Sequence, residues 1–256
     1  MSTLLLRLAA PMQSWGDSSR FAHRQTRQEP TKSGVLGLLA AAQGRRRSDP
    51  IEDLTQLTFG VRIDQPGRLI RDFHTAHMQN GKPTPLSYRF YLGDALFLAA
   101  VEGDSGFLTN LDESLRSPIF PLYLGRRSCP PSGPVAIGVF QGSLIDVLHR
   151  QPWAAARWYQ RQLRASSVDL EIVRDATQEE AEHGSSAGAR EAIRDEPVSY
   201  DPERREYGWR DVIREWVPGV PNPTMHAAPA GQVDVSRTER PAGLDDHDPM
   251  ACLGGG

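Results

Sequence analysis

Apolar and polar positions along the first 150 residues predict alternating strands and helices. Residues 3–8, TLLLRL, are a short apolar run that predicts a buried strand. Thr31 is a good N-cap residue, and the apolar residues after it recur at helical spacing as far as Gly44. Further along, the pattern predicts a strand at 57–64, a strand at 69–78, a return strand at 86–103, a helix at 106–115 and a strand at 135–140.

With the strand at 69–78 counted as part of a projecting hairpin, the order is strand, helix, strand, strand, helix, strand, which is typical of the ferredoxin-like arrangement. Right-handed crossovers would place both helices on one face of the sheet. Between the strands at 69–78 and 86–103, the sequence QNGKPTP at 79–85 contains residues that exclude a helix and predict a hairpin tip. The sequence therefore predicts an α+β fold, with a ferredoxin-like core over residues 1–150 and a projecting hairpin.

The second part of the chain is less regular. Residues 151–217 are expected to form a smaller part, rich in β-structure, with a helical segment before it that breaks near Pro152. The acidic stretch 178–195 contains Gly and Ser and is expected to be a mobile loop. The other predictions are a strand at 168–175, hairpin arms at 196–202 and 207–218, and an extended or disordered tail at 218–256.

Charged residues are distributed unevenly. Residues 1–150 contain 17 Lys/Arg and 13 Asp/Glu, whereas residues 151–256 contain 12 and 19. This asymmetry indicates a local polyanion site in the first part, not a basic surface overall. All basic residues except Lys32 and Lys82 are arginines, which bind phosphate as planar forks and stack on bases. A genome that favours arginine codons would give the same excess without a ligand.

Several classes of protein are disfavoured by the sequence. Cys129 and Cys252 are far apart and form neither a C-x-x-C pair nor a disulfide framework. The N-terminal sequence lacks the basic start and long apolar core of a signal peptide. No stretch approaches the roughly 20 apolar residues of a membrane span. We therefore expect a cytoplasmic protein with no membrane partner.

The stretch PTKSG at 30–34 resembles a helix start that binds phosphate. It is not a Walker A loop. That loop has a Gly, four further residues and then Gly-Lys-Ser/Thr, whereas here Gly34 follows Lys32. The free N–H groups of a helix N-terminus still favour an anion, and Lys32, Ser33 and Gly34 would add donors and close approach. The alternative is an ordinary capped helix that binds nothing.

Two irregular segments offer further contacts to a polyanion. In LGRRSCPPSGP at 124–134, Arg126, Arg127 and Ser128 lie in a tight loop that can present guanidinium groups and N–H groups to phosphates. In PMQSWG at 11–16, Trp15 could stack on a base or fill the end of the core. Solvated arginines in a surface turn are the alternative for the first segment.

The predicted hairpin contains His74, His77, Lys82 and Tyr88. An extended segment places the two histidines on different faces, which disfavours a metal site. His, Lys and Tyr could instead transfer protons in a metal-independent cleavage of RNA, or contact RNA without chemistry. The sequence contains no nucleophile elbow, no H-E-x-x-H and no paired carboxylate motif.

The motifs PMQSWG, PTKSGVLGLLAAA, DFHTAH, YRFYLGDA, PLYLGRRSCPPS and DEPVSYDPERREYGWR occur here in that order. Together they resemble the CasD family, the subunit that holds the CRISPR RNA 5′ handle in type I-E Cascade. The resemblance covers about residues 1–217. It implies an RRM-related (RAMP) ferredoxin-like core with a β-hairpin thumb at about 74–91. It also implies partners: the CRISPR RNA 5′ handle, the backbone subunit and the large PAM-reading subunit, with target DNA met only within the complex.

The resulting hypothesis is a non-catalytic RNA-binding subunit without a cofactor or a metal. Two alternatives stay open: an endoribonuclease that processes repeat RNA, because a type I-C relative cuts RNA with a Tyr–Lys–His type of site, and a protein–protein adaptor without RNA contact. The expected RNA-binding residues are Gln13, Ser14, Trp15, Arg20, Arg24, Lys32, Ser33, Gly34, His74, His77, Lys82, Tyr88, Arg89, Arg126, Arg127 and Ser128.

Overall fold

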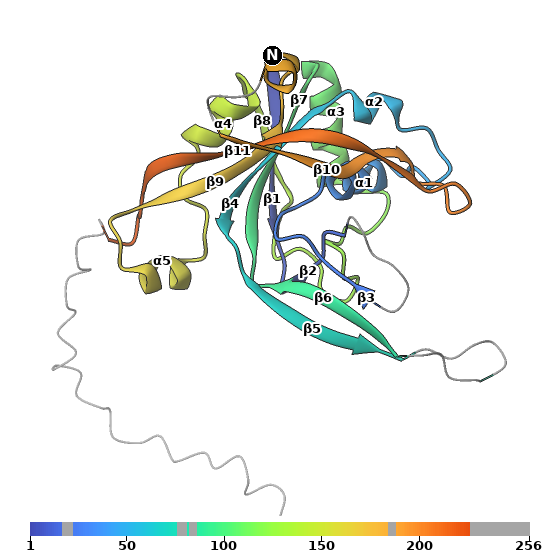
Figure 1. Ribbon diagram of the computed structural model, residues 1–256, viewed down its shortest axis with the longest axis horizontal. Coiled ribbons are helices and arrows are strands. Elements are labelled where there is room, and N and C mark those ends of the chain that lie inside the picture. Colours follow the sequence, from blue (N-terminus) through green and yellow to red (C-terminus); the bar gives the residue numbers. More distant parts are fainter. Residues whose placement is uncertain (17–22, 76–80, 82–85, 184–187, 226–256) are drawn as a thin grey trace, which may run out of the picture.

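The computed structural model describes residues 1–16, 23–75, 81, 86–183 and 188–225. Its strands form a seven-stranded sheet in the order β10-β11-β9-β4-β7-β1-β8 and a smaller sheet in the order β2-β6-β3, with β5 paired to β6 (Figure 1). Within these residues, every helix falls short of the length and apolar content that a transmembrane crossing requires.

The centre of the large sheet consists of four antiparallel strands that the sequence predicted. They are β1 (Ser2–Ala9), β4 (Thr58–Gln65), β7 (Leu96–Gly103) and β8 (Ala136–Gln141). The strand β7 lies between β1 and β4, and β8 pairs with the other side of β1. Because side chains alternate along a strand, Leu4 and Leu6 point to one core cluster while Leu5 points to the other.

The predicted helices α1 (Lys32–Ala42) and α3 (Ser105–Arg116) cover one face of this sheet. Each begins at a side-chain cap, since Thr31 and Asp104 accept hydrogen bonds from the backbone N–H groups of Gly34 and Phe107. The short helix α2 (Glu52–Thr55) leads into β4. The other face carries α4 (Leu144–Arg150), and α5 (Arg157–Leu163) follows it, so the predicted break near Pro152 is confirmed.

A second sheet leaves the core at the predicted hairpin. The strands β5 (Arg68–His74) and β6 (Ser87–Gly93) pair with each other, and β2 (Met12–Gln13) and β3 (His23–Arg24) pair with the other edge of β6. The segment 86–103, predicted as one strand, is two strands in different sheets. The chain turns between them at Asp94, whose φ of 55° is left-handed, and between β4 and β5 at Gly67.

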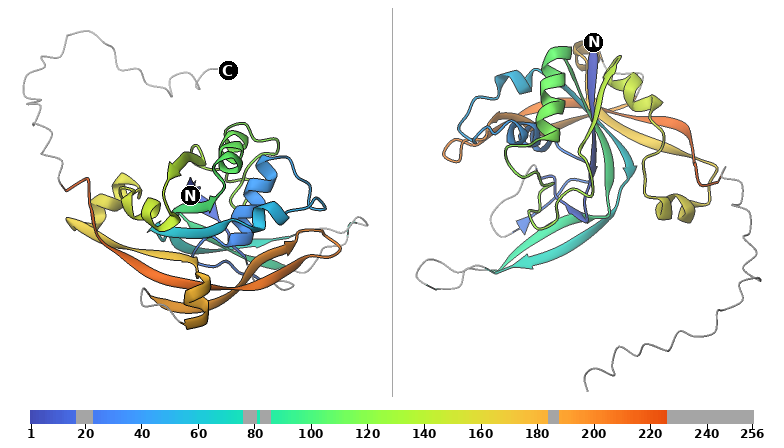
Figure 2. Two further views of the ribbon diagram at one scale, coloured as in Figure 1. Left: turned by 90° about the horizontal axis from the view of Figure 1, so that it is seen from above. Right: turned by 180° about the vertical axis from the view of Figure 1, so that it is seen from behind.

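The C-terminal part extends the same large sheet. The strand β9 (Ser167–Asp175) pairs with β4 and β11 (Glu206–Pro221), and β11 pairs with β10 (Ala189–Ser199). The expectation of a mobile loop at 178–195 is therefore wrong in part, because α6 (Gln178–His183) and β10 occupy much of it. The first residues of the predicted tail belong to β11, and Asn222 after it is fully buried. The two further views in Figure 2 show this sheet from above and from behind.

Candidate nucleic-acid interface

Two segments that the sequence singled out, 11–16 and 124–134, pack against each other. The backbone N–H of Ser14 donates to the carbonyl of Leu124 at 2.9 Å. Gly125 has φ of 88°, and a Cβ there would lie 2.3 Å from the Ser14 carbonyl oxygen. Only glycine satisfies both the conformation and the close approach, so Gly125 fixes where Arg126 begins.

Arg126 is held by side chains from three segments. Its Nη1 donates to Asp72 Oδ2 on β5 at 2.5 Å, and its Nε donates to Ser128 Oγ at 3.1 Å. Its guanidinium carbon lies 4.7 Å from the centre of the Tyr91 ring on β6. The Arg126 guanidinium lowers the pKa of the Asp72 carboxyl, and the backbone N–H of Phe73 lowers it further. Arg126 is therefore a prealigned cation against the middle of the hairpin strands.

Further basic residues lie around Asp72. The strand register places Arg24 opposite Arg89 and Arg89 opposite Asp72, in one row across β3, β6 and β5. Residues directly opposite in a sheet share a face, so the three side chains lie together. His74 Nε2 on the same face is 3.4 Å from Asp72 Oδ2. We call this set, with Arg126, the basic face of the hairpin.

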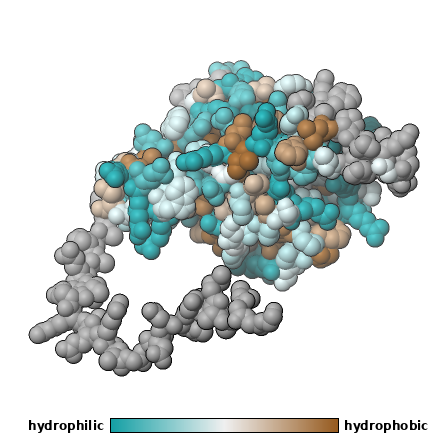
Figure 3. All heavy atoms as spheres, turned by 90° about the horizontal axis from the view of Figure 1, so that it is seen from below, coloured by the Kyte–Doolittle hydropathy of each residue, from teal (hydrophilic) through white to brown (hydrophobic). Residues whose placement is uncertain are grey.

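The other face of the hairpin is partly apolar. Leu69 and Phe73 are 64% exposed, and the Arg71 guanidinium carbon lies 5.5 Å from the centre of the Tyr88 ring. Beyond the hairpin, Arg127 lies over the Tyr123 ring at 5.8 Å. Figure 3 shows the molecule from below, where brown hydrophobic spheres lie in small separate areas among teal hydrophilic ones. Such pairs of exposed rings and guanidinium groups are typical of surfaces that bind single-stranded nucleic acid.

Gln13 and Trp15 are structural residues, which corrects the expectation that they contact RNA. Gln13 is fully buried, and its Nε2 donates to the Ala95 carbonyl at 2.7 Å while its Oε1 accepts from Trp15 Nε1 at 3.3 Å. Trp15 is 3% exposed and belongs to the main core cluster. An indole without exposed surface cannot stack on a base, so the alternative of a core plug holds.

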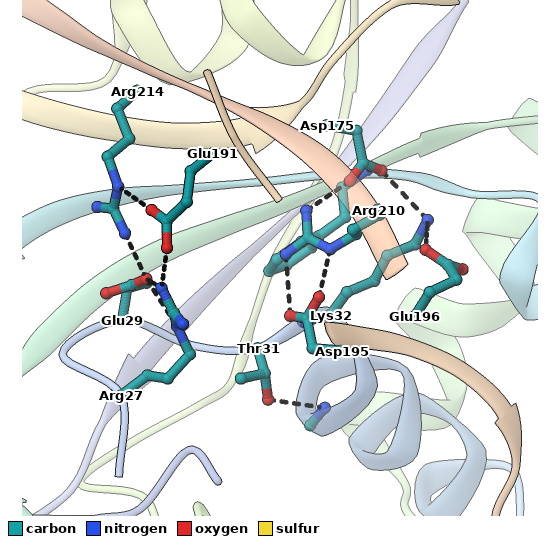
Figure 4. A network of polar contacts seen from close by, with 12 residues as sticks. Arg27, Glu29, Thr31, Lys32, Asp175, Glu191, Asp195, Glu196, Arg210 and Arg214 are labelled. Atoms are coloured by element: carbon teal, nitrogen blue, oxygen red, sulfur yellow. Dashed lines mark hydrogen bonds and ion pairs between the residues drawn. The ribbon is translucent and has the colours of Figure 1, made fainter. Parts of the chain in front are cut away.

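The start of α1 has internal acidic partners, which corrects the expectation of a phosphate there. The backbone N–H of Lys32 donates to Asp195 Oδ2 at 2.8 Å. The Lys32 Nζ lies 3.2 Å from Asp175 Oδ2 and 2.8 Å from Glu196 Oε2 (Figure 4). The anionic partners of the helix start and of the Lys32 side chain are thus three carboxylates of the chain itself. Gly34 serves packing, because a Cβ there would lie 2.8 Å from the Trp15 ring.

The same carboxylates are shared with Arg210 on β11. Its Nη1 lies 2.6 Å from Asp175 and its Nε 2.6 Å from Asp195, and Asp195 is 1% exposed. Burial raises the pKa of Glu196, and Lys32 opposes that rise. We call Lys32, Asp175, Asp195, Glu196 and Arg210 the buried charge cluster.

A second network beside it ties the segment before α1 to the large sheet. Glu29 accepts from Arg27 at 2.8 Å and from Arg214 at 2.7 Å, and Glu191 pairs with both arginines (Figure 4). Local patterns did not reveal these pairs, because Glu191 lies in the stretch 178–195 that was expected to be a mobile loop, and Glu29 and Arg214 are 185 positions apart. The signal in the sequence was the mixture of six Arg and eight Asp/Glu within residues 189–215.

The predicted contacts Arg20, His77 and Lys82 lie outside the described residues. Ser33 is buried, and its carbonyl accepts from the Tyr200 hydroxyl. Within the described ranges, no group of three His, Cys, Asp or Glu side chains is placed to hold a metal ion. The structure therefore brings together Ser14, Arg24, His74, Arg89, Arg126 and Ser128, and it separates Gln13, Trp15, Lys32, Ser33 and Gly34 from them as buried residues.

Comparison with known proteins finds relatives that are described as CRISPR or Cas proteins. Residues 3–213 match the family described as CRISPR-associated protein (Cas_Cas5). The CRISPR system Cascade subunit CasD of Escherichia coli (strain K12) is 35% identical over 163 residues, which cover 56% of this chain and 73% of that protein.

Two solved structures are similar over most of the chain. One, described as the crystal structure of a Cas protein, has a TM-score of 0.63 and 36% identity and covers 86% of this chain and 95% of its own. The other, a chain of a CRISPR RNA-guided surveillance complex, has a TM-score of 0.68 and 29% identity, with coverages of 90% and 95%. Since the family match spans most of the sequence, the chain belongs to the Cas5 family of CRISPR-associated proteins.

Proposed function

We propose that this chain is a non-catalytic RNA-binding subunit of a type I-E CRISPR surveillance complex and that it holds the 5′ handle of CRISPR RNA. Its relative CasD is a Cascade subunit, and one similar structure is an RNA-guided surveillance complex. The observation that carries the proposal is Arg126, whose guanidinium is fixed by Asp72, Ser128 and Tyr91. A cation held in one orientation loses little freedom when it binds a phosphate.

The arrangement of the core supports a ferredoxin-like, RRM-related assignment. The strand order β8-β1-β7-β4, with α1 and α3 on one face, is the order expected for that arrangement. The hairpin of β5 and β6 would be the base of a thumb at about residues 74–91. We propose residues 1–150 as the RNA-binding part, 151–217 as a C-terminal part and 218–256 as a tail.

The proposed site would contact both the phosphates and the bases of the RNA. Arg24, Arg89, Arg126 and Arg127 would bind the phosphates of a bent RNA segment, and Tyr88 would stack on an unstacked base. Ser14, Gln13 and Trp15 would be structural residues that hold this RNA-binding surface in place. Each phosphate neutralised on single-stranded RNA contributes about −0.7 to the log–log salt slope, so three to five contacts predict a slope of about −2 to −3.5.

The experiment compares two pairs of arginines. Arg126→Ala with Arg127→Ala should weaken handle RNA binding and complex assembly without unfolding the chain. Arg46→Ala with Arg47→Ala is the control, because these two residues are an adjacent, exposed arginine pair that lies after α1, away from the hairpin. Equal handle affinity in the two variants would contradict the proposed site.

The nuclease alternative has its own test. Register places Tyr88 opposite Phe73 and His74 opposite Ser87, so Tyr88 and His74 lie on different faces of the hairpin. We therefore propose that Tyr88 binds RNA without chemistry. Incubation of the purified protein with repeat RNA in EDTA should leave the RNA intact. Cleavage that disappears in Tyr88→Phe would establish the endoribonuclease instead.

Within the complex, we propose contacts to the backbone subunit and to the large PAM-reading subunit, in the cytoplasm. An adaptor without RNA contact is the remaining alternative. Photocrosslinking of the assembled complex with 4-thiouridine in the handle separates the two, because an adaptor would give no adduct on this chain.

A further inference from the structure

We propose that α5 forms a second RNA-binding surface, which takes single-stranded RNA outside the handle. This α5 surface consists of Arg157, Trp158, Arg161, Leu163 and Arg164, all of which are exposed. It lies on the opposite side of the molecule from the hairpin of β5 and β6 (Figures 1 and 2). Figure 3 shows hydrophilic and hydrophobic spheres side by side near the point where the grey trace leaves the described chain.

The α5 surface is a positive area in an acidic part of the chain. From Gln151 to Val168 the sequence contains no Asp or Glu. The three arginines form no ion pair with any other described residue. The next acidic residue, Asp169, accepts from the backbone N–H of Gly219 at 2.8 Å. Unpaired arginines on one short helix concentrate positive potential where a phosphate chain can reach it.

Trp158 supplies an aromatic ring among these cations. Its side chain is 51% exposed, and its ring centre lies 5.7 Å from that of Tyr159 with an interplanar angle of 84°. Tyr159 meets the buried Trp153 in a second edge contact at 6.1 Å. The indole is therefore anchored by its neighbours while half of its surface faces solvent. A fixed, exposed indole between arginines is the usual means of stacking an unpaired base.

A fully buried ion pair supports the segment that carries α5. Arg62 Nε and Asp64 Oδ1 are 2.8 Å apart, and both side chains are 0% exposed. The remaining Arg62 donors reach the carbonyls of Leu148, Gln151 and Pro152. Such a pair is expensive to bury unless its hydrogen bonds are complete. Here those bonds fix the connector between α4 and α5.

Both ends of α5 are also held. Gln65 Oε1 accepts from the N-cap N–H of Ala156 at 3.0 Å. Asn222 Nδ2 donates to the carbonyls of Gln160 and Ala165 at 2.9 Å each. A surface helix of this length has little stability of its own, so these contacts set its position. A rigid mounting of this kind preorganises the exposed side chains for a ligand.

Arg164 gives a further reason to expect a ligand. It is the C-cap of α5, with φ of 50°. Glycine is favoured at such a left-handed position, and a long side chain there costs free energy. A charged residue kept in a strained conformation beside two other cations fits a role in binding.

Single-stranded RNA is the occupant that these features favour. An acidic protein segment would need the arginines but not a half-exposed indole, and a duplex hides the base faces that stack. The choice of RNA over DNA as the ligand rests on the proposed function. The inference that the α5 surface binds single-stranded nucleic acid does not depend on that function. The handle experiment tests that function separately, because its RNA contains the handle and the RNA used here does not.

The test uses the full chain and an unstructured, labelled RNA of about 12 nucleotides, unrelated to the repeat, with binding followed by anisotropy. Trp158→Ala should lower affinity by about fivefold to a hundredfold, from the usual strength of base stacking. Arg157→Gln with Arg161→Gln should reduce the log–log salt slope by about 1.4. The matched controls, Trp209→Ala and Arg46→Gln with Arg47→Gln, should bind as the wild type does.

Arg164→Gly separates binding from folding. Glycine relieves the left-handed strain, so the melting temperature should stay the same or rise while RNA affinity falls. The proposal is overturned if the α5 variants bind like their controls, or if DNA of the same sequence or polyglutamate binds more tightly than RNA. It is also overturned if RNA binds only to a chain ending at Met225, since the acidic segment 226–256 would then be the occupant.

Discussion

Two short stretches, TKSG at 31–34 and GRRS at 125–128, have nearly the same composition and different environments. In the first, Lys32 is 6% exposed and meets two carboxylates through its side chain and a third through its backbone. In the second, Arg126 meets one carboxylate, and Arg127 and Ser128 are exposed. Whether a cation can bind an external phosphate therefore depends on the carboxylates that the rest of the chain brings to it.

The difference also assigns opposite roles to the two stretches. A buried cation surrounded by acids stabilises the fold, because each partner would be left uncompensated without the others. A partly exposed cation with one acidic partner contributes little to stability and keeps donors for a ligand. The following predictions test this division, beginning with the largest effect.

Lys32→Ala should destabilise the protein by about 3–5 kcal/mol, because it removes the cation that pairs with Glu196 and leaves Asp175 with Arg210 alone. Urea denaturation measures the change. Arg116→Ala is the control, since Arg116 is 53% exposed in its pair with Asp112 and should cost less than about 1 kcal/mol. A Lys32→Ala protein that is as stable as the wild type but no longer binds handle RNA would show that Lys32 binds the ligand and does not stabilise the fold.

Arg126→Ala should show the converse behaviour. We expect handle RNA affinity to fall by about tenfold to a hundredfold, the usual strength of a hydrogen bond to a charged group. The free energy of unfolding should change by less than about 1 kcal/mol, since the Arg126–Asp72 pair is partly exposed. Filter binding and urea denaturation of the same preparation give both numbers. A loss of stability as large as that of Lys32→Ala would contradict the account.

Asp72→Asn tests whether Asp72 positions Arg126. Removing a negative charge beside RNA should by itself raise affinity. If Asp72 aligns Arg126, handle affinity should instead fall by a few-fold, and the effect should vanish in an Arg126→Ala background. Asp94→Asn is the matched control, because Asp94 is exposed near the base of the hairpin and its φ of 55° suits asparagine. If Asp72→Asn and Asp94→Asn changed handle affinity equally, Asp72 would not be the residue that positions Arg126.

The smallest expected effect is a pH dependence in the buried charge cluster. Burial raises the pKa of Glu196 above its ordinary value of 4.5, despite the opposing effect of Lys32. The folded state then binds more protons than the unfolded state between these two pKa values, so stability falls as pH rises through that window. Glu196→Gln should remove this decline, which is at most about 1.4 kcal/mol per pH unit. If the free energy of unfolding of the wild type and of Glu196→Gln varied in parallel with pH, this role of Glu196 would be contradicted.

Much of the fold follows from local patterns in the sequence. The apolar run at 3–8, the alternation at 57–64, the cap at Thr31 and the helical spacing of apolar residues at 106–115 predict central strands and helices. These signals are local because each comes from side chains that face a single core. The packing of 124–134 against the hairpin needs contacts between distant residues, which the sequence indicated only as a resemblance to a family.

The errors at the acidic stretch 178–195 and at Lys32 have a common physical cause. The part of β10 up to Asp195 was predicted as a loop, and its acids Glu191 and Asp195, like Glu196 after them, are charged. Each of these acids pairs with a cation from another segment, so polar residues occupy positions that apolar ones would fill in an ordinary strand. The same pairing hid the role of Lys32. Lys32 and Asp175 are 143 positions apart, and Arg27 and Glu191 are 164 positions apart, so no local pattern reveals these pairs.

The most direct test of the proposed function is the position of the RNA on the chain. Complexes assembled with CRISPR RNA that carries 4-thiouridine in the handle would be irradiated and digested, and the crosslinked peptides identified. We predict adducts on the peptides that contain Arg24, Tyr88 or Arg126–Ser128, and none on the peptide that begins α1 at Lys32. Adducts confined to the start of α1, or their absence from this chain, would contradict the account.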